Sequence, residues 1–273
     1  RRRGGRLTGH GAFLSHAKCG CGGHTRPMGF ITNETVAVIT GGTRGIGLEA
    51  ARGIGRLGAT VVLVGQDPAR TERAAMELVA EGIDAVGEIS DVADPVSLAA
   101  AKERLGALGE PDVLVLSAGV MAERMTKTLR TSSEEWRRVM GINLDGAFYS
   151  IATFAQGMAR KRSGRVIGVS ACLGRFSGPG TSGGLAPYRI SKAGLNALLR
   201  NFAAEMQWGA RGVLVDAMCP AHCRTDMGGP DAPRSAAEGA DTIVWLADRD
   251  AVDAQGAVVE TGKLWEDRAV VPW

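Results

Sequence analysis

The stretch TGGTRGIG, residues 40–47, decides the fold of this chain. It directly continues the β-branched, uninterrupted apolar run TVAVIT at 35–40, and a helical pattern follows it. Three glycines then have separate uses: Gly41 permits a tight turn, Gly45 lets the backbone approach a pyrophosphate, and Gly47 allows helix and strand to pack closely. The free N–H groups of the following helix face the phosphates. The stretch therefore predicts a dinucleotide site.

The rest of the chain alternates strand and helix patterns in the same way. We expect strands at 35–40, 60–64, 85–90, 112–116, 165–170 and 213–218, a last short strand near 257–260, and helices at 45–57, 68–81, 95–107, 132–160 and 187–208. Continuous apolar strands that alternate with helices are typical of parallel strands covered on both faces. The predicted fold class is α/β, with a Rossmann-type doubly wound parallel sheet.

Length and composition fit one large domain. The chain has 273 residues, of which 45% are hydrophobic, and this is enough for a substantial core. No shift in composition divides residues 28–273, so we interpret them as a single domain. No run approaches the roughly 18 apolar residues of a membrane-spanning helix, so we expect no membrane partner.

Residues 1–27 differ from the remainder in charge. They carry six Lys and Arg residues and no acid, so the net charge of this segment is +6. Because the net charge of the whole chain is +3, the remaining residues have a net charge of −3. The mildly acidic body predicts no nucleic-acid partner. The segment is rich in Gly and Arg, lacks the apolar core of a secretory signal and precedes Met28. We interpret it as a disordered extension, or as an upstream-translated or appended tail.

The cysteines do not suggest a disulfide framework. Their number is odd and their spacing irregular, which fits a reducing cytoplasm. Cys19 and Cys21, with His16 and His24 nearby, lack the usual two-pair zinc spacing, so no metal site is predicted. Cys172 is interpreted as a packing residue, because no His adjoins it in the sequence. The five cysteines are Cys19, Cys21, Cys172, Cys219 and Cys223.

The end of the second predicted strand, VLVGQD, bears on the choice between NAD and NADP. An acid at this point commonly binds the ribose 2′-hydroxyl, but the position holds Gly65, and Asp67 two residues later starts the next turn. Arg44, inside the glycine loop, can pair with a 2′-phosphate because a guanidinium suits phosphate well. The sequence favours NADP(H) over NAD(H).

The pentapeptide YRISK places Tyr188 four residues before Lys192. Residues i and i+4 share one face of a helix, so the pair fits an ordinary amphipathic helix. It also fits an acid–base pair, because a phenol titrates near pH 10 and a neighbouring cation lowers its pKa toward the working range. The pentapeptide alone does not separate the two readings.

Together these motifs resemble the classical short-chain dehydrogenase/reductase family, in its carbonyl-reductase-like branch. The resemblance covers roughly residues 34–273 and includes the ending CPAHCRTDMGGPDAPRSAAEGADTIVWLA. It implies that Tyr188 is the general acid in carbonyl reduction, and that Lys192 lowers the pKa of the phenol and binds the nicotinamide ribose. Asn143, in GINLDG, would hold a water in the proton relay.

The resemblance also implies a set of cofactor contacts. Asp91 contacts the adenine in this pattern, and Thr225 with the backbone at Cys223 holds the carboxamide. The expected cofactor-binding residues are Gly41, Thr43, Arg44, Gly45, Ile46, Gly47, Gln66, Asp91, Val92, Ser117, Ala118, Gly119, Tyr188, Lys192, Pro220, Cys223 and Thr225.

Three departures from the family pattern stand out. LSAG, with Leu116 and Ser117, replaces N-N-A-G and is expected to cost hydrogen bonds to the central strand. In VSACLG the position of the catalytic serine is open: alignment on Gly174 places Ala171 there, and Ser170 fills it only if the strand end twists. In PAHCRT, Ala221 stands where glycine is usual.

Other loop residues carry weaker expectations. His222 either touches substrate or is merely exposed or hydrogen-bonded. The glycine-rich loop 174–187 is expected to border the substrate cleft, and 226–240 resembles the mobile lid of the family.

The leading functional hypothesis is an NADP(H)-dependent oxidoreductase that interconverts a ketone or aldehyde and an alcohol by hydride transfer. Its catalytic residues would be Tyr188, Lys192, Asn143 and Ser170. The partners would be a small carbonyl or alcohol substrate and further copies of the chain, as a homodimer or homotetramer paired through the helices at 132–160 and 188–208. Two alternatives stay open: a nucleotide-binding regulatory module with weakened redox activity, and an enzyme of non-redox proton transfer such as dehydration, epimerisation or cyclisation.

Overall fold

The computed structural model describes residues 29–122 and 127–273. The expectations for residues 1–27, including the one for Cys19 and Cys21, lie outside this part of the chain. Within it, no helix is long and apolar enough to cross a membrane.

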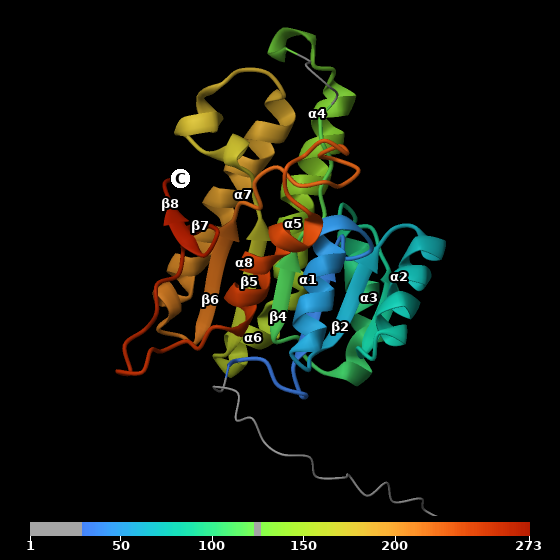
Figure 1. Ribbon diagram of the computed structural model, residues 1–273, viewed down its shortest axis with the longest axis vertical. Helices are drawn as coiled ribbons and strands as arrows, with labels where there is room; N and C mark the ends of the chain where they lie inside the picture. Colours follow the sequence, from blue (N-terminus) through green and yellow to red (C-terminus); the bar gives the residue numbers. More distant parts are fainter. Residues whose placement is uncertain (1–28, 123–126) are drawn as a thin grey trace, which may run out of the picture.

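One eight-stranded sheet forms the middle layer of the molecule (Figure 1). The strand order is β3-β2-β1-β4-β5-β6-β7-β8, with parallel pairing from β3 to β7 and an antiparallel β8 at the edge. The strands are β1 (Val36–Thr40), β2 (Thr60–Gly65), β3 (Ala85–Ile89), β4 (Val113–Leu116), β5 (Gly164–Val169), β6 (Val213–Met218), β7 (Leu264–Glu266) and β8 (Ala269–Val271).

Helices cover both faces of the sheet. The α-helices are α1 (Gly45–Arg56), α2 (Pro68–Ala80), α3 (Pro95–Arg104), α4 (Ser133–Met140), α5 (Gly146–Phe154), α6 (Gln156–Lys161), α7 (Ala186–Glu205) and α8 (Ala236–Asp248). Short turns of other helical types are η1 (Leu105–Leu108), η2 (Thr128–Arg130), η3 (Gly141–Asp145), η4 (Cys172–Gly174), η5 (Gly178–Thr181) and η6 (Gln207–Gly209). The predicted single α/β domain with a doubly wound parallel sheet is confirmed.

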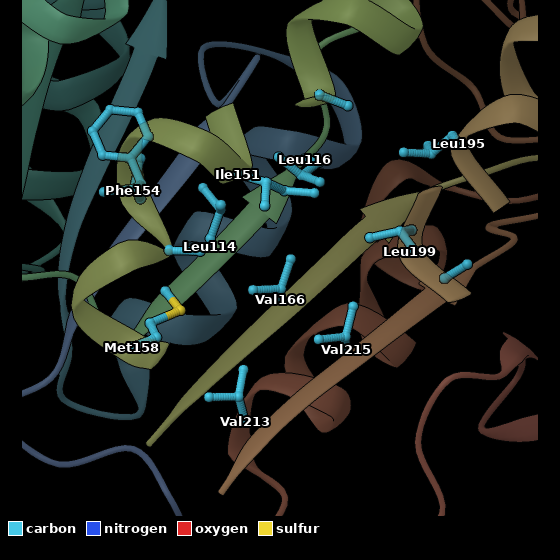
Figure 2. Packing of buried hydrophobic residues seen from close by; sticks show 14 of the residues in the cluster. Leu114, Leu116, Ile151, Phe154, Met158, Val166, Leu195, Leu199, Val213 and Val215 are labelled. Carbon is cyan, nitrogen blue, oxygen red and sulfur yellow. The ribbon is translucent and has the colours of Figure 1, made fainter. Parts of the chain in front are cut away.

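The hydrophobic core lies in two layers, one on each face. Successive residues of a strand point to opposite faces, so Val166 joins the layer under α3, α5 and α7, and Ile167 joins the layer under α1, α2 and α8. Figure 2 shows the first layer, where Leu114 of β4, Val215 of β6 and Leu199 of α7 converge on Val166. The uninterrupted apolar strands of the sequence are thus explained by burial on both sides.

Two sequence expectations about elements are wrong. The predicted strand near 257–260 is absent; Val258 only makes an isolated bridge to Val252, and the strand that joins β6 is β7, a few residues later. The predicted helix 132–160 is divided into α4, α5 and α6, with a π-turn, η3, between the first two. Such π-turns often mark functional sites.

Candidate functional site

A cleft of about 900 Å³ opens at the carboxyl ends of the central parallel strands. The chain leaves β1 toward β2 and β3 on one side and returns to β4 on the other, so a crevice forms beyond the strand ends. Residues that follow β1, β2, β3, β4, β5 and β6 all line it. Every expected cofactor-binding residue is among the lining residues, as is Ser170.

The glycine loop between β1 and α1 forms one wall of the cleft. Gly41 and Gly45 have φ angles of +65° and +54°, which favour glycine because a Cβ would be strained there. A Cβ on Gly45 would lie 3.1 Å from the Thr225 Cγ2 atom, and one on Gly47 would collide with the Gly41 carbonyl oxygen. The backbone of this loop is therefore exposed to the cleft in a way that only glycines allow.

Helix α1 begins at this loop without a side-chain cap. Its first N–H groups therefore lack the usual side-chain acceptor and can bind an anion, aided by the helix dipole. The loop, the helix terminus and the size of the cleft fit a dinucleotide, with the pyrophosphate at the start of α1.

The end of β2 carries no acid, and two threonine side chains crowd the position. A Cβ on Gly65 would lie 2.6 Å from Thr43 Cγ2 and 2.8 Å from Thr71 Oγ1. Asp67 is the N-cap of α2, where its side chain accepts a 2.9 Å hydrogen bond from the backbone N–H of Arg70. The carboxylate nearest in sequence is thus used to start a helix, as the sequence suggested.

Arg44 is the cation that the glycine loop presents to the cleft. It forms an ion pair with Asp226, which the sequence analysis did not single out. Both side chains are more than half exposed, at 53% and 74%, so the pair contributes little to stability. The guanidinium can exchange this partner for a phosphate at small cost.

Tyr188 and Lys192 lie in the first two turns of α7 and point into the cleft region. Both are buried, at 6% and 5% exposure. The Lys192 ammonium donates a 2.7 Å hydrogen bond to the Val169 carbonyl at the end of β5 and lies 5.9 Å from the centre of the Tyr188 ring. The two residues of the suggested acid–base pair thus line the cleft, and one of them is hydrogen-bonded to the end of a central strand.

Burial dominates the titration of both groups. It raises the pKa of Tyr188 well above the ordinary value of a phenol, with a smaller contribution from the Cys219 and Cys172 sulfurs. It lowers the pKa of Lys192 to about 8, because a charged form is disfavoured away from water. The expectation that Lys192 lowers the pKa of Tyr188 is therefore wrong for the protein alone: the ammonium is directed to a backbone carbonyl, and desolvation outweighs it.

Asn143 occupies the π-turn η3 behind the cleft wall. It is 1% exposed and is not a lining residue. Its side chain accepts from the Val120 N–H at 2.8 Å and donates to the Val120 carbonyl and to Ser191 Oγ, both at 3.0 Å. Asn143 thereby ties the segment after β4 to α7, and these bonds account for the break in the long predicted helix.

The structure argues against Ser170 as the catalytic serine. Its hydroxyl donates a 2.5 Å hydrogen bond to Asn196 Oδ1 of α7, and the residue is 2% exposed. Ala171 instead packs against the apolar cluster that contains Tyr188, Ala122 and Val139. Successive residues at a strand end face opposite ways, so the methyl group of Ala171 stands on the tyrosine side and the hydroxyl of Ser170 does not.

The loop 174–187 differs from expectation, whereas the loop with Ala221 and His222 agrees with it. No residue of 174–187 is among the described residues that line the cleft; Arg189 instead donates to the carbonyls of Pro179 and Gly180 in this loop. Ala221 has a φ of +58°. Glycine adopts this left-handed conformation more easily than alanine, because it has no Cβ. His222 lines the cleft and pairs with the Gly228 carbonyl at 2.8 Å.

Sequence reasoning missed three contributors to the site. Asp226 and Met227, in the expected lid, line the cleft. Asn196, one turn beyond Lys192, accepts from Ser170 and donates to the Gly174 carbonyl, so it fixes the turn after β5. Its spacing of four from Lys192 is a signal that could have been used. Among the described residues no cluster of metal-ligating side chains was found.

Comparison with known proteins gives consistent matches over most of the chain. Residues 35–259 match the family model described as short chain dehydrogenase. The chain is 31% identical over 241 residues to the 3-oxoacyl-(acyl-carrier-protein) reductase of Pseudomonas aeruginosa, covering 87% of this chain and 94% of the relative. It is 32% identical over 198 residues to the L-tagatose-forming galactitol 2-dehydrogenase of Cereibacter sphaeroides, covering 72% and 75%.

Solved structures agree with this fold. A 3-oxoacyl-(acyl-carrier protein) reductase from Brucella melitensis with bound NAD has a TM-score of 0.73 at 28% identity, covering 85% of this chain and 88% of that one. A variant of the actinorhodin polyketide ketoreductase with NADPH has a TM-score of 0.74 at 25% identity, covering 85% and 95%. These matches include NAD and NADPH complexes and do not single out the carbonyl-reductase-like branch.

Proposed function

Because the chain belongs to the short-chain dehydrogenase family, we propose that it is an NADP(H)-dependent oxidoreductase that interconverts a ketone or aldehyde and an alcohol, a reductase of the carbonyl-reductase type. The observation that carries the proposal is the position of Tyr188 and Lys192 in the same cleft as the glycine loop. The family supports hydride transfer, and the residues of this cleft support the assignment of roles.

The end of β2 and the glycine loop support NADP(H). Gly65 leaves no carboxylate for a 2′-hydroxyl, and a side chain there would require Thr43 and Thr71 to move, which supports this preference. Arg44 lines the cleft beside this point, and its exposed partner Asp226 can be displaced. A guanidinium binds a phosphate by two parallel hydrogen bonds, so Arg44 would hold the 2′-phosphate.

The remaining expected contacts would lie along the cleft, each beside a different part of the cofactor. Asp91 and Val92, after β3, would contact the adenine, and Ser117, Ala118 and Gly119 would line the groove. Thr225 and the backbone at Cys223 would hold the carboxamide beyond Pro220. When bound, the nicotinamide supplies or accepts the hydride.

Tyr188 would give its proton to the carbonyl oxygen during reduction. Because burial keeps the pKa of the phenol high, the group is protonated at neutral pH and has a proton to donate. Lys192, whose pKa is about 8, is protonated at neutral pH and places a positive charge near the phenolate that forms. Asn143, which donates a hydrogen bond to Ser191 Oγ, would hold a water in the proton relay.

Ala171 in place of a hydroxyl would leave the developing oxyanion with one donor fewer. The loss of such a donor commonly costs on the order of 10²–10³ in rate. Reduction is then expected to be slow with simple ketones. The same observation favours the second candidate, a non-redox proton transfer by Tyr188 or a nucleotide-binding role with weakened redox activity.

The test is the oxidation of NADPH by the purified full chain, with a panel of ketones, aldehydes and quinones, and with Tyr188→Phe as the control. Turnover that disappears in Tyr188→Phe, with NADPH binding unchanged, supports the reductase. NADPH binding with no turnover on any panel member would favour the second candidate.

Association with further copies of the chain is also proposed. Trp136 of α4, Phe148 of α5 and Ile190 of α7 are exposed, at 38%, 52% and 45%. These lie on the helices expected to pair across subunits, and large exposed apolar side chains on neighbouring helices favour an interface. A dimer or tetramer in sedimentation that becomes a monomer in Phe148→Asp would support this; a monomeric wild type would contradict it.

A further inference from the structure

We propose that Cys172 and Cys219 form a reactive dithiol at the edge of the cleft, which a hydroperoxide converts to a disulfide and thereby reversibly inhibits the enzyme. The dithiol itself is independent of the proposed function; only the inhibition rests on it. This assigns a chemical role to Cys172, which the sequence analysis interpreted as a packing residue.

The strand pairing brings the two cysteines together. β5 and β6 are parallel, with Val169 opposite Met218, and the pairing continues through the 2.7 Å bond from the Ser170 N–H to the Met218 carbonyl. Cys219 directly follows β6, and Cys172 begins the turn η4 after β5. Cys219 belongs to the core layer under α7, and Cys172 packs against the same layer.

The two cysteines are neighbours at the ends of the paired strands β5 and β6, within one apolar layer, and they differ in access. Cys219 is 1% exposed, whereas Cys172 is partly exposed and lines the cleft. A hydroperoxide that enters the cleft therefore meets Cys172 first, with Cys219 behind it as the resolving thiol.

The surroundings of Cys172 favour its thiolate. The neighbouring Cys219 thiol lowers the pKa of Cys172 to about 6, helped by the Leu173 N–H and by Arg175, while partial burial and Glu266 act in the opposite direction. The neighbouring Cys172 sulfur and burial raise the pKa of Cys219. A thiolate at neutral pH is the nucleophilic form of a cysteine.

The reaction balances with a hydroperoxide as the only oxidant. The Cys172 thiolate attacks the terminal peroxide oxygen, so that an S–O bond forms, the O–O bond breaks and an alcohol or water leaves. The Cys219 sulfur then attacks the Cys172 sulfur, which forms the S–S bond and releases water. The two thiols lose two electrons and two protons in total, and the peroxide is reduced by two electrons.

A disulfide here would disturb the catalytic residues directly. Cys172 follows Ala171, which packs against the cluster containing Tyr188. A Cβ on Gly174, two residues later, would lie 2.7 Å from the Lys192 Cβ, so the turn has no free space on that side. Drawing Cys172 toward β6 therefore shifts a turn that is in contact with both Tyr188 and Lys192.

The test uses the full chain with Cys19→Ser and Cys21→Ser, which removes the other thiols outside the described residues. After treatment with hydrogen peroxide and alkylation of remaining thiols, peptide mass spectrometry is expected to find a Cys172–Cys219 cross-link that dithiothreitol removes. Cys223→Ser on this background is the matched control and is expected to form the same cross-link. Cys219→Ala is expected to stop at a Cys172 sulfenic acid, which dimedone labels.

Activity is measured on the same samples. We expect at least a tenfold loss of turnover on oxidation, restored by dithiothreitol, and no such loss in Cys172→Ser relative to its own untreated rate. Absence of the cross-link, with Cys172 alkylated no faster than Cys223, would overturn the dithiol. A cross-link without loss of turnover would overturn the inhibition. A cross-link in a protein without turnover on any substrate would leave the dithiol established and count against the proposed function alone.

Discussion

The Lys192 ammonium lies 5.9 Å from the centre of the Tyr188 ring, while its hydrogen bond goes to the end of β5. One side chain of α7 thus secures the strand end and holds a positive charge beside the phenol. Burial of Lys192 lowers the stability of the chain, because the ammonium prefers its uncharged form there. Such a cost is common at functional sites.

Lys192→Met should stabilise the protein while it removes activity. The native pKa of about 8 lies below the ordinary lysine value of 10.5, and this difference corresponds to a charging cost of about 3 kcal/mol. The lost hydrogen bond to Val169 offsets part of it, so we expect a gain of about 1–3 kcal/mol.

The gain of Lys192→Met should depend on pH. The native state binds fewer protons at this site than the unfolded state between the two pKa values, so the wild type gains stability as pH rises through that window. The advantage of the variant is therefore largest below pH 8 and shrinks toward pH 10.5. Thermal unfolding across pH checks this, with Lys127→Met as the exposed control. An advantage that does not change with pH would contradict the buried charge.

Ser170→Ala and Ala171→Ser should have opposite effects. The first leaves Asn196 without its buried donor and is expected to cost about 1–3 kcal/mol in stability, with turnover within about threefold of wild type. The second adds a hydroxyl on the tyrosine side and should raise the rate of carbonyl reduction by about tenfold. This gain is smaller than the one that a preorganised donor contributes. Unfolding and steady-state rates of both variants check the pair. A hundredfold loss of turnover in Ser170→Ala at unchanged stability would identify Ser170 as catalytic.

Arg44→Ala should weaken NADPH binding far more than NADH binding. A charge-assisted hydrogen bond contributes about 1.5–3 kcal/mol, so the Kd for NADPH should rise by about tenfold or more while that for NADH changes by less than about threefold. Asp226→Asn is the matched variant. It releases Arg44 from an exposed ion pair and should tighten NADPH binding by up to about fivefold. Fluorescence titration with both cofactors measures this, and equal effects on NADH and NADPH would refute the proposed preference.

Ala221→Gly should stabilise the protein. Ala221 has a φ of +58°, which costs a residue with a Cβ about 1 kcal/mol, and glycine removes this cost. Because glycine also increases the conformational entropy of the unfolded chain, the net gain in the free energy of unfolding is expected to be about 0.5 kcal/mol. Ala99→Gly, at an exposed position inside α3, is the control and should lose about 1 kcal/mol. Destabilisation by both substitutions would contradict the strain at Ala221.

The doubly wound fold could be predicted because burial on both faces leaves an apolar run in the central strands β1, β2 and β4, and helical patterns alternate with the strands. The edge of the sheet formed by β7 and β8 could not be predicted. β7 and β8 have three residues each, and the turn between them places Asp267 and Arg268 at φ +48° and +60° without a glycine. The usual Asn-Gly signal of a two-residue hairpin is therefore missing. Helix α8 also went unpredicted, although its capping box of Ser235 and Glu238 was a usable signal.

The glycine loop, Tyr188 and Lys192 could be placed from local spacing, because the residues of one turn or one helix face are near each other in sequence. The partners of these residues come from distant segments. Arg44 and Asp226 are 182 residues apart, and the proximity of Cys172 to Cys219 depends on the pairing of β5 with β6. Likewise, the direction of the Ser170 hydroxyl depends on where α7 places Asn196. Only the folded chain shows such relationships.

The central claim is hydride transfer with Tyr188 as the acid, and isotope transfer tests it most directly. NADPH that carries deuterium at the transferable position of the nicotinamide is incubated with the full chain and the carbonyl panel, and the alcohols are analysed by mass spectrometry. We predict deuterium on the carbinol carbon of a product with the wild type and, because general acid catalysis is worth about 10²–10⁴, a loss of that order with Tyr188→Phe at unchanged NADPH binding. Deuterium-free products, or equal transfer by both proteins, would contradict the account.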